Sequence, residues 1–135
     1  MNGVLVFFLA AFVFQLTTSN PTAKYGGTHF VKWDNREIGG RWFECTIGTQ
    51  WSDGRYLVRL YDYDYGTGTF RPNEISILGV ESTVGDQVLA YWEGSHYAYK
   101  GIHGATDSHG KIWVEFDDGI NVLTESSAVY KFVTL

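Results

Sequence analysis

The sequence predicts an all-β protein made of two small barrels in tandem, and three observations support this fold class. Short segments rich in β-branched and aromatic residues alternate with Gly, Ser and Asp, as antiparallel strands and their turns require. Many residues in the first half match residues 56 positions later, which indicates an internal repeat. Aromatic residues make up 17% of the 135 residues and only two are Pro, a composition that favours a compact protein over a disordered one.

The charge balance excludes one broad class of partner. The chain carries 10 Lys and Arg against 15 Asp and Glu, which gives a formal net charge of −5 at pH 7. A protein that binds nucleic acid through its phosphates needs Lys and Arg gathered on one face. We therefore expect no nucleic-acid partner.

Residues 1–19 have the character of a secretory signal peptide. Residues 4–14 are an unbroken apolar run that is too short to span a bilayer, and small residues follow it up to Ser19. We expect cleavage after Ser19, a mature chain that begins at Asn20, a secreted extracellular protein and no membrane contact after cleavage. The apolar run lacks the usual preceding positive charge, and the alternative is a buried N-terminal strand or helix.

Two stretches of the chain share one pattern. Residues 25–78 form the first unit, residues 84–135 form the second, and residues 79–83 join them. The pairs at the constant offset of 56 are Phe43 and Tyr99, Cys45 and Gly101, Gly54 and Gly110, Val58 and Val114, Leu60 and Phe116, and Asp62 and Asp118. Two copies are too few for a solenoid, so we expect two small units that pack face to face.

The first unit shows strand alternation most clearly around its cysteine. Phe43, Cys45 and Ile47 fall on one face of the expected strand, which we predict to be the core face, and Trp42 and Glu44 fall on the opposite face. Since the chain has a single cysteine, no disulfide can form within it, and the alternation predicts a buried, inert thiol.

The second unit carries motifs in a fixed order. Gly85-Asp86 opens a strand that ends at Trp92, Tyr99-Lys100-Gly101 lies in the next strand, and Phe116-Asp117-Asp118-Gly119 closes the third. With this order and spacing, residues 84–132 resemble the Tudor family, in particular a tandem Tudor module. Tudor domains are small SH3-like barrels that bind methylated lysine or arginine. The resemblance implies two SH3-like barrels in tandem and no long helix.

The resemblance also implies a ligand site in the second unit. Trp92, Tyr99, Phe116 and Asp118 fall on the positions that form the family's pocket for a methylated ammonium group. Ring faces attract such a cation, and a carboxylate can pair with its remaining N–H. Ile120 stands where close relatives carry another ring, which leaves a more open, three-ring cage. The alternative is that these rings pack the barrel or the contact between the units.

In the first unit, Leu60 interrupts the corresponding set of rings. Next to it, Tyr61, Tyr63 and Tyr65 alternate with aspartates, which places the three tyrosines on one face of an extended ribbon. This ribbon is a second candidate contact surface, for sugar, protein or mineral. The alternative is an edge strand whose aspartates discourage aggregation.

No sequence pattern indicates catalysis or a cofactor. The four histidines show no compact metal-ligand spacing with acidic partners. No glycine-rich phosphate loop follows a strand and opens a helix, and no nucleophile elbow appears. We expect no enzyme activity, no metal and no cofactor.

Hypotheses about function differ in cellular location. The first is a secreted, non-enzymatic binding protein that reuses the tandem Tudor-like scaffold for an extracellular protein, matrix or glycan ligand. The second is an intracellular reader of methyl-lysine or methyl-arginine, which is what the resemblance implies. A structural component of an extracellular or mineralised matrix is a third class compatible with the acidic charge and the tyrosines. The sequence indicates neither the ligand nor an oligomeric state.

Overall fold

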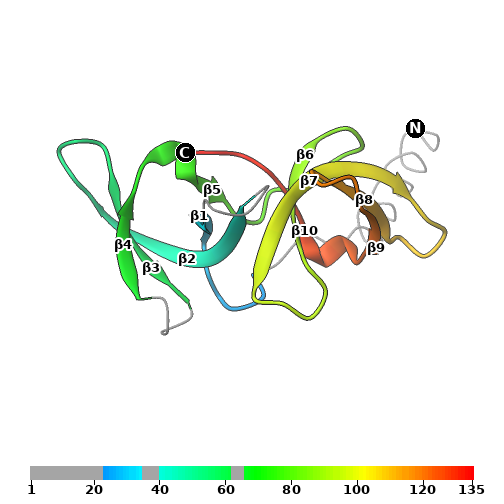
Figure 1. Cartoon of the computed structure of the whole chain (residues 1–135), viewed down its shortest axis with the longest axis horizontal. Helices are drawn as coiled ribbons and strands as arrows, with labels where there is room; N and C mark the ends of the chain where they lie inside the picture. The colour runs from blue at the N-terminus through cyan, green and yellow to red at the C-terminus, as the bar shows by residue number, and fades with distance from the viewer. Residues whose placement is uncertain (1–22, 35–39, 62–65) are drawn as a thin grey trace, which may run out of the picture.

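The structure is a computed structural model that describes residues 23–34, 40–61 and 66–135 (Figure 1). The strands of the first unit are β1 (His29–Asp34), β2 (Arg41–Gln50), β3 (Tyr56–Leu60), β4 (Thr67–Phe70) and β5 (Ile75–Ile77). Those of the second are β6 (Gln87–Tyr91), β7 (Tyr97–Thr106), β8 (Ile112–Phe116), β9 (Asn121–Thr124) and β10 (Val129–Lys131). Short 3-10 helices, η1 (Pro72–Glu74) and η2 (Ser126–Ala128), precede β5 and β10.

The prediction of an all-β fold is confirmed. Within the described ranges, both helices are single 3-10 turns. No helix there is long and apolar enough to cross a membrane. The signal peptide expected over residues 1–19 lies outside the described residues.

The two units have the same strand arrangement. In each, four antiparallel strands follow one another as a meander, and a fifth strand returns to pair with the first, β5 with β1 and β10 with β6. This is the arrangement that an SH3-like barrel requires. β2 begins at Arg41 and β7 at Tyr97, which is the offset of 56 found in the sequence (97 minus 41). The repeat in the sequence therefore corresponds to a repeat in the fold.

Gly110 and Gly101 of the second unit are required for different physical reasons. Gly110 turns the hairpin between β7 and β8 with a φ of 81°, and Gly54 turns the matching hairpin of the first unit with a φ of 92°. Side chains other than glycine are strained at such φ values. Gly101, which matches Cys45, is required for another reason, because an added Cβ would lie 2.7 Å from the carbonyl oxygen of Glu115. The same barrel therefore tolerates a side chain at this place in one copy only.

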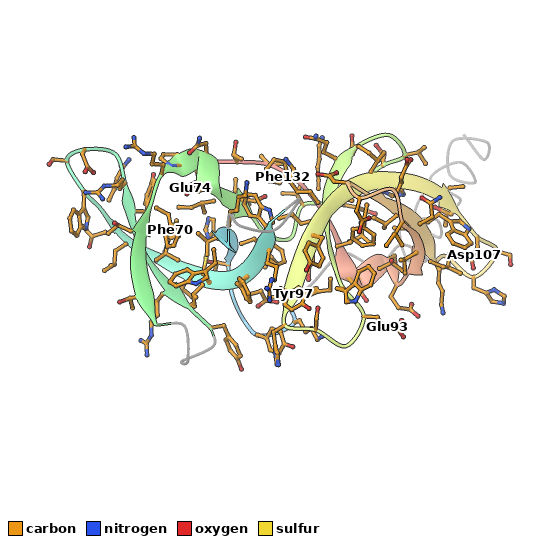
Figure 2. All side chains as sticks on the ribbon, viewed as in Figure 1. Phe70, Glu74, Glu93, Tyr97, Asp107 and Phe132 are labelled. Atoms are coloured by element: carbon orange, nitrogen blue, oxygen red, sulfur yellow. The ribbon has the colours of Figure 1, made fainter. Side chains whose placement is uncertain are left out.

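The two units join into one sheet because β2 pairs with β7. Trp42 lies opposite Ala98 and Phe43 lies opposite Tyr97 in this antiparallel contact. Figure 2 shows Tyr97 between the two units. The contact between the units thus includes direct strand pairing, which the sequence did not indicate.

The C-terminal residues cross from the second unit to the first, as the red segment in Figure 1 shows. The N–H of Ile77 donates to the carbonyl oxygen of Val133 at 2.8 Å, and the N–H of Leu135 donates to that of Ile75 at 3.1 Å. The buried hydroxyl of Ser76 donates to the Val133 carbonyl and accepts from the Val133 N–H, both at 3.1 Å. The tail therefore fastens the second unit to β5.

Three clusters of buried side chains form the core. The first barrel contains Val31, Phe43, Cys45, Val58, Leu60 and Ile75. The second barrel contains Val88, Ala90, Ile112, Val114, Phe116 and Val129. The third cluster, which we call the junction core, takes residues from both units and contains Phe30, Trp42, Leu89, Tyr91, Ala98 and Tyr130. Because the junction core draws on both units, each unit buries apolar surface that it could not bury alone.

The two faces of β2 are both buried at its start. Phe43 and Cys45 lie in the first barrel, as predicted. Trp42 and Glu44, on the opposite face, are only 2% and 3% exposed. The alternation predicted only the face of Phe43 and Cys45 to be the core face. The second buried face exists because the second unit covers it.

The buried position of Cys45 predicts an unreactive thiol. Burial and the neighbouring Glu44 carboxylate raise the pKa of the Cys45 thiol to about 12, so it stays protonated near neutral pH. We expect a disulfide-exchange reagent to label Cys45 only after unfolding, with the labelling rate followed in buffer and in denaturant. An unfolded cysteine peptide serves as the reference for full reactivity. Labelling of the folded protein at the rate of this peptide would contradict the burial.

Candidate functional site

Three aromatic rings of the second unit meet at one end of its barrel. Trp92 directly follows β6, Phe116 ends β8, and Tyr99 lies near the start of the antiparallel β7, so the three positions fall at the same end. The ring centroids of Trp92 and Tyr99 are 6.2 Å apart at 85°, and those of Trp92 and Phe116 are 5.5 Å apart at 65°. Aromatic rings prefer such edge-to-face contacts. We call Trp92, Tyr99 and Phe116 the ring cluster.

The ring cluster is partly core and partly surface. Phe116 is only 4% exposed and belongs to the core of the second barrel. Trp92 and Tyr99 are half-buried and pack against that core. The surface on which a ligand could rest therefore comes from Trp92 and Tyr99, and Phe116 supports it from beneath.

Asp118 lies in the turn that follows the ring cluster. Its Oδ1 accepts a hydrogen bond from the Ile120 N–H at 3.0 Å, and the Phe116 N–H donates to the Ile120 carbonyl oxygen at 2.9 Å. Asp118 and Ile120 are both exposed. The structure thus brings the three rings into contact and places the fourth predicted residue in the adjoining turn, where its carboxylate faces solvent.

A cleft of about 680 Å³ opens beside the ring cluster. Trp92 and Phe116 form part of its wall, but Tyr99 does not. The other lining residues come from the chain before β1, the end of β6 and the residues after it, the turn before β8, β9, η2 and β10. They include Lys24, Tyr91, Glu93, Lys111, Val122, Leu123, Glu125, Ser127, Ala128 and Tyr130. Glu93 marks this end of the second unit in Figure 2. We call this hollow the side cleft.

Glu44 is a buried carboxylate with four donors. It accepts hydrogen bonds from the backbone N–H groups of Lys24, Tyr25 and Gly27, at 2.6, 2.9 and 2.9 Å. The fourth donor is the Tyr91 hydroxyl of the second unit. A buried charge is tolerated when it is fully hydrogen-bonded in this way. Glu44 therefore fixes both the segment before β1 and the end of β6.

Two tyrosine hydroxyls near this carboxylate stay protonated. Burial, and next the hydrogen bond to Glu44, raise the pKa of Tyr91 far above its usual value. Burial and the charge of Glu44 likewise raise the pKa of Tyr130. Neither hydroxyl ionises in the physiological range.

The tyrosine ribbon predicted in the first unit is only partly described. Tyr61 is 53% exposed, and its ring contacts that of Tyr25 at 5.0 Å. The His96 ring of the second unit also packs against the Tyr25 ring, with the ring centroids 5.3 Å apart. The three rings border a hollow of about 560 Å³ at the junction. Tyr63 and Tyr65 lie outside the described residues.

The first unit has a different arrangement at the position of the ring cluster. Leu60 is buried in the barrel core, so no third ring stands there. Trp33 instead contacts Phe70 of β4, with ring centroids 5.4 Å apart. A Cβ at Gly68 would lie 3.0 Å from the Phe70 ring, so glycine makes room for this contact.

The polar groups of the described chain provide no metal site. Within residues 23–34, 40–61 and 66–135, no three His, Cys, Asp or Glu side chains are grouped as metal ligands. His103, which matches Ile47 in the first unit, lies buried with its Nδ1 2.8 Å from the Ser82 hydroxyl. Burial lowers the pKa of His103, which favours the neutral ring in this pair.

Comparison with known proteins identifies the fold. No protein-family model matches the chain, and no curated protein matches it significantly. The crystal structure of Arabidopsis thaliana AGDP1 AGD34 matches with a TM-score of 0.52 at 16% identity, over 90% of this chain and 86% of that chain. The crystal structure of the ADCP1 tandem Agenet domain 3-4 matches with a TM-score of 0.50 at 15% identity, over 90% and 84%.

The fold is that of a tandem Tudor-like module. The resemblance found in residues 84–132 is thereby confirmed for the fold, and it extends over both units. At such low identity, the likeness concerns the fold of the module alone.

Two features of this fold were not predicted from the sequence, namely the buried Glu44 and the side cleft. The burial of Glu44 was not predicted because the alternation favoured the opposite face of β2 as the core face. Trp42, on the same face as Glu44, was a signal of burial. The side cleft was not predicted because its walls come from segments that lie far apart in the chain, and no local sequence pattern links these segments.

Removal of the Tyr91 hydroxyl should destabilise the module. Tyr91→Phe leaves the ring in the junction core but takes one donor from the buried Glu44 carboxylate. We expect the free energy of unfolding to fall by about 1.5–3 kcal/mol, the contribution of a hydrogen bond to a charged group. Denaturant titration of both proteins measures the change.

Tyr56→Phe is the matched control, since no hydrogen bond links the half-buried Tyr56 hydroxyl to any described residue. It should change the free energy of unfolding by less than about 0.5 kcal/mol. Equal effects of the two substitutions would show that Glu44 does not depend on Tyr91.

Proposed function

We propose that this chain is a non-enzymatic binding module that holds a methylated ammonium group against the ring cluster of its second unit. One observation carries the proposal: the rings of Tyr99 on β7, Phe116 on β8 and Trp92 just after β6 meet at interplanar angles of 85° and 65°, and two of the three rings are partly accessible. The tandem Tudor-like fold supports a binding role by analogy.

The chemistry of the ring cluster suits a weakly hydrated cation. Each ring face attracts a cation by about 0.5–2 kcal/mol, depending on how far it is removed from water. The exposed carboxylate of Asp118 adds negative charge in the adjoining turn. The exposed Ile120 stands in that turn where a further ring would close the site, so we expect weak binding. The first unit has Leu60 at the matching position and is not proposed to bind this group.

Loss of the Trp92 ring should abolish binding. We expect trimethyl-lysine to bind the wild type in a calorimetric or NMR titration and unmodified lysine to bind at least several-fold more weakly, because methylation weakens the hydration of the cation. Trp92→Ala should remove detectable binding. Because Trp92 is half-buried, its removal should destabilise the fold by less than the roughly 3–5 kcal/mol expected for a fully buried tryptophan.

Trp113→Ala is the matched control. Trp113 lies on β8 of the same unit, is 45% exposed and takes no part in the ring cluster. Binding should survive this substitution. Equal loss of binding in the two variants, or no preference for the methylated form, would rule out the ring cluster as the site.

We further propose that the apolar segment before Ser19 exports the module, so that its ligand is an extracellular protein or matrix component. The hydrophobic pattern of residues 4–14 supports this location. The second candidate, an intracellular reader of methyl-lysine or methyl-arginine, is favoured by the ring cluster itself.

The intact mass of the protein from its native source separates the two locations. Export predicts a mature chain that begins at Asn20, because cleavage follows the small residues after the apolar run. A chain that retains residues 1–19 would instead favour the intracellular reader.

A further inference from the structure

We propose that the side cleft binds an apolar side chain of the same peptide that presents the methylated lysine. The module would then recognise two residues of one extended peptide. This inference rests on the proposed function, and it adds a second site and a class of ligand, namely a methylated lysine with an apolar residue close by.

The two sites share walls. Trp92 and Phe116 belong to the ring cluster and also line the side cleft, whereas Tyr99 stands only in the ring cluster. A ligand that rests on Trp92 and Tyr99 therefore lies at the mouth of the side cleft. Alternate side chains of an extended peptide point to the same side and are about 7 Å apart. The apolar residue is thus expected two positions before or after the methylated lysine.

The chemistry of the side cleft selects an apolar group. Val122, Leu123 and Ala128 line it together with aromatic rings. Its charged lining residues are balanced, because two lysines and two glutamates contribute. Lys111 pairs with Glu125 at 3.3 Å. The balanced charges favour neither a positive nor a negative ligand side chain, whereas an apolar side chain would leave water on entering the cleft.

Lys24, on another side of the cleft, also makes contacts within the protein. Lys24 Nζ donates to the Ser95 carbonyl oxygen at 3.0 Å and lies 5.2 Å from the centre of the Tyr91 ring. The Lys24 backbone is held by Glu44. The volume of about 680 Å³ falls within the range of ligand sites in proteins. These contacts hold the Lys24 side of the cleft in place, which reduces the entropy lost on binding.

Peptides with a central trimethyl-lysine test the inference. One peptide has only Gly and Ser around the modified residue, and others carry a single Leu or a single Ala two positions before or after it. We expect Leu at one of these positions to tighten binding about five- to tenfold over Ala, because the larger side chain buries more apolar surface. Fluorescence anisotropy of labelled peptides measures the affinities.

The Ser127→Phe variant tests whether the preference for Leu arises in the side cleft. Ser127 is exposed on η2 and lines the cleft but is not part of the ring cluster, so a ring there should fill the cleft and leave the fold intact. We expect this variant to lose the preference for Leu and to bind free trimethyl-lysine as the wild type does. Ser108→Phe, at an exposed position in the turn between β7 and β8, should keep the preference. Melting curves check that both variants fold.

Failures of the two proposals can be told apart. If trimethyl-lysine binds but neither Leu position improves affinity, or if Ser127→Phe keeps the preference, the inference is overturned and the proposed function stands. If free trimethyl-lysine does not bind the wild type, the proposed function falls. Affinity that depends on Leu but not on methylation would overturn recognition of the two residues together.

Discussion

The fold depends on one buried charge at the junction of the two units. Moving a carboxylate out of water is unfavourable by several kcal/mol unless its oxygens are hydrogen-bonded. Glu44 meets this condition only when Lys24, Tyr25 and Gly27 turn their N–H groups inward and Tyr91 approaches from the second unit. The relative position of the units is therefore set by hydrogen bonds that have a direction as well as by apolar burial.

The hydrogen bond of Glu44 also affects the candidate site, because Tyr91, which donates it, is directly followed by Trp92. Tyr91 ends β6 with its hydroxyl on Glu44 and its ring in the junction core. The next residue, Trp92, packs on the core of the second barrel instead, as the alternation of an extended chain requires. The orientation of Trp92 thus follows from that of Tyr91. A binding surface at the end of one barrel is stabilised by the contact between the two.

The two units have diverged while keeping one framework. The starts of β2 and β3 and the irregular pairing near the end of β2 recur 56 residues later in β7 and β8, whereas the starts of β1, β4 and β5 recur at offsets of 58, 54 and 54 residues. The side chains on this framework differ, since Leu60 stands in the first unit where Phe116 stands in the second. In the first unit, Trp33 turns to Phe70 of β4. The second unit therefore presents the ring cluster, and the first contributes the strand, the buried carboxylate and the β5 edge that hold it.

The sequence by itself determined the class of fold, the repeat and the meeting of Trp92, Tyr99 and Phe116. The class of fold and the repeat follow from local alternation, turn residues and spacing, which the order of residues records directly, whereas the grouping of the three rings was implied by the resemblance to the Tudor family. Only the tertiary structure decided that β2 joins β7, that the tail reaches β5, that Glu44 is buried and that a cleft opens beside the rings. These features depend on which surfaces of two similar units come together, and a contact between distant segments leaves no periodic trace in the chain.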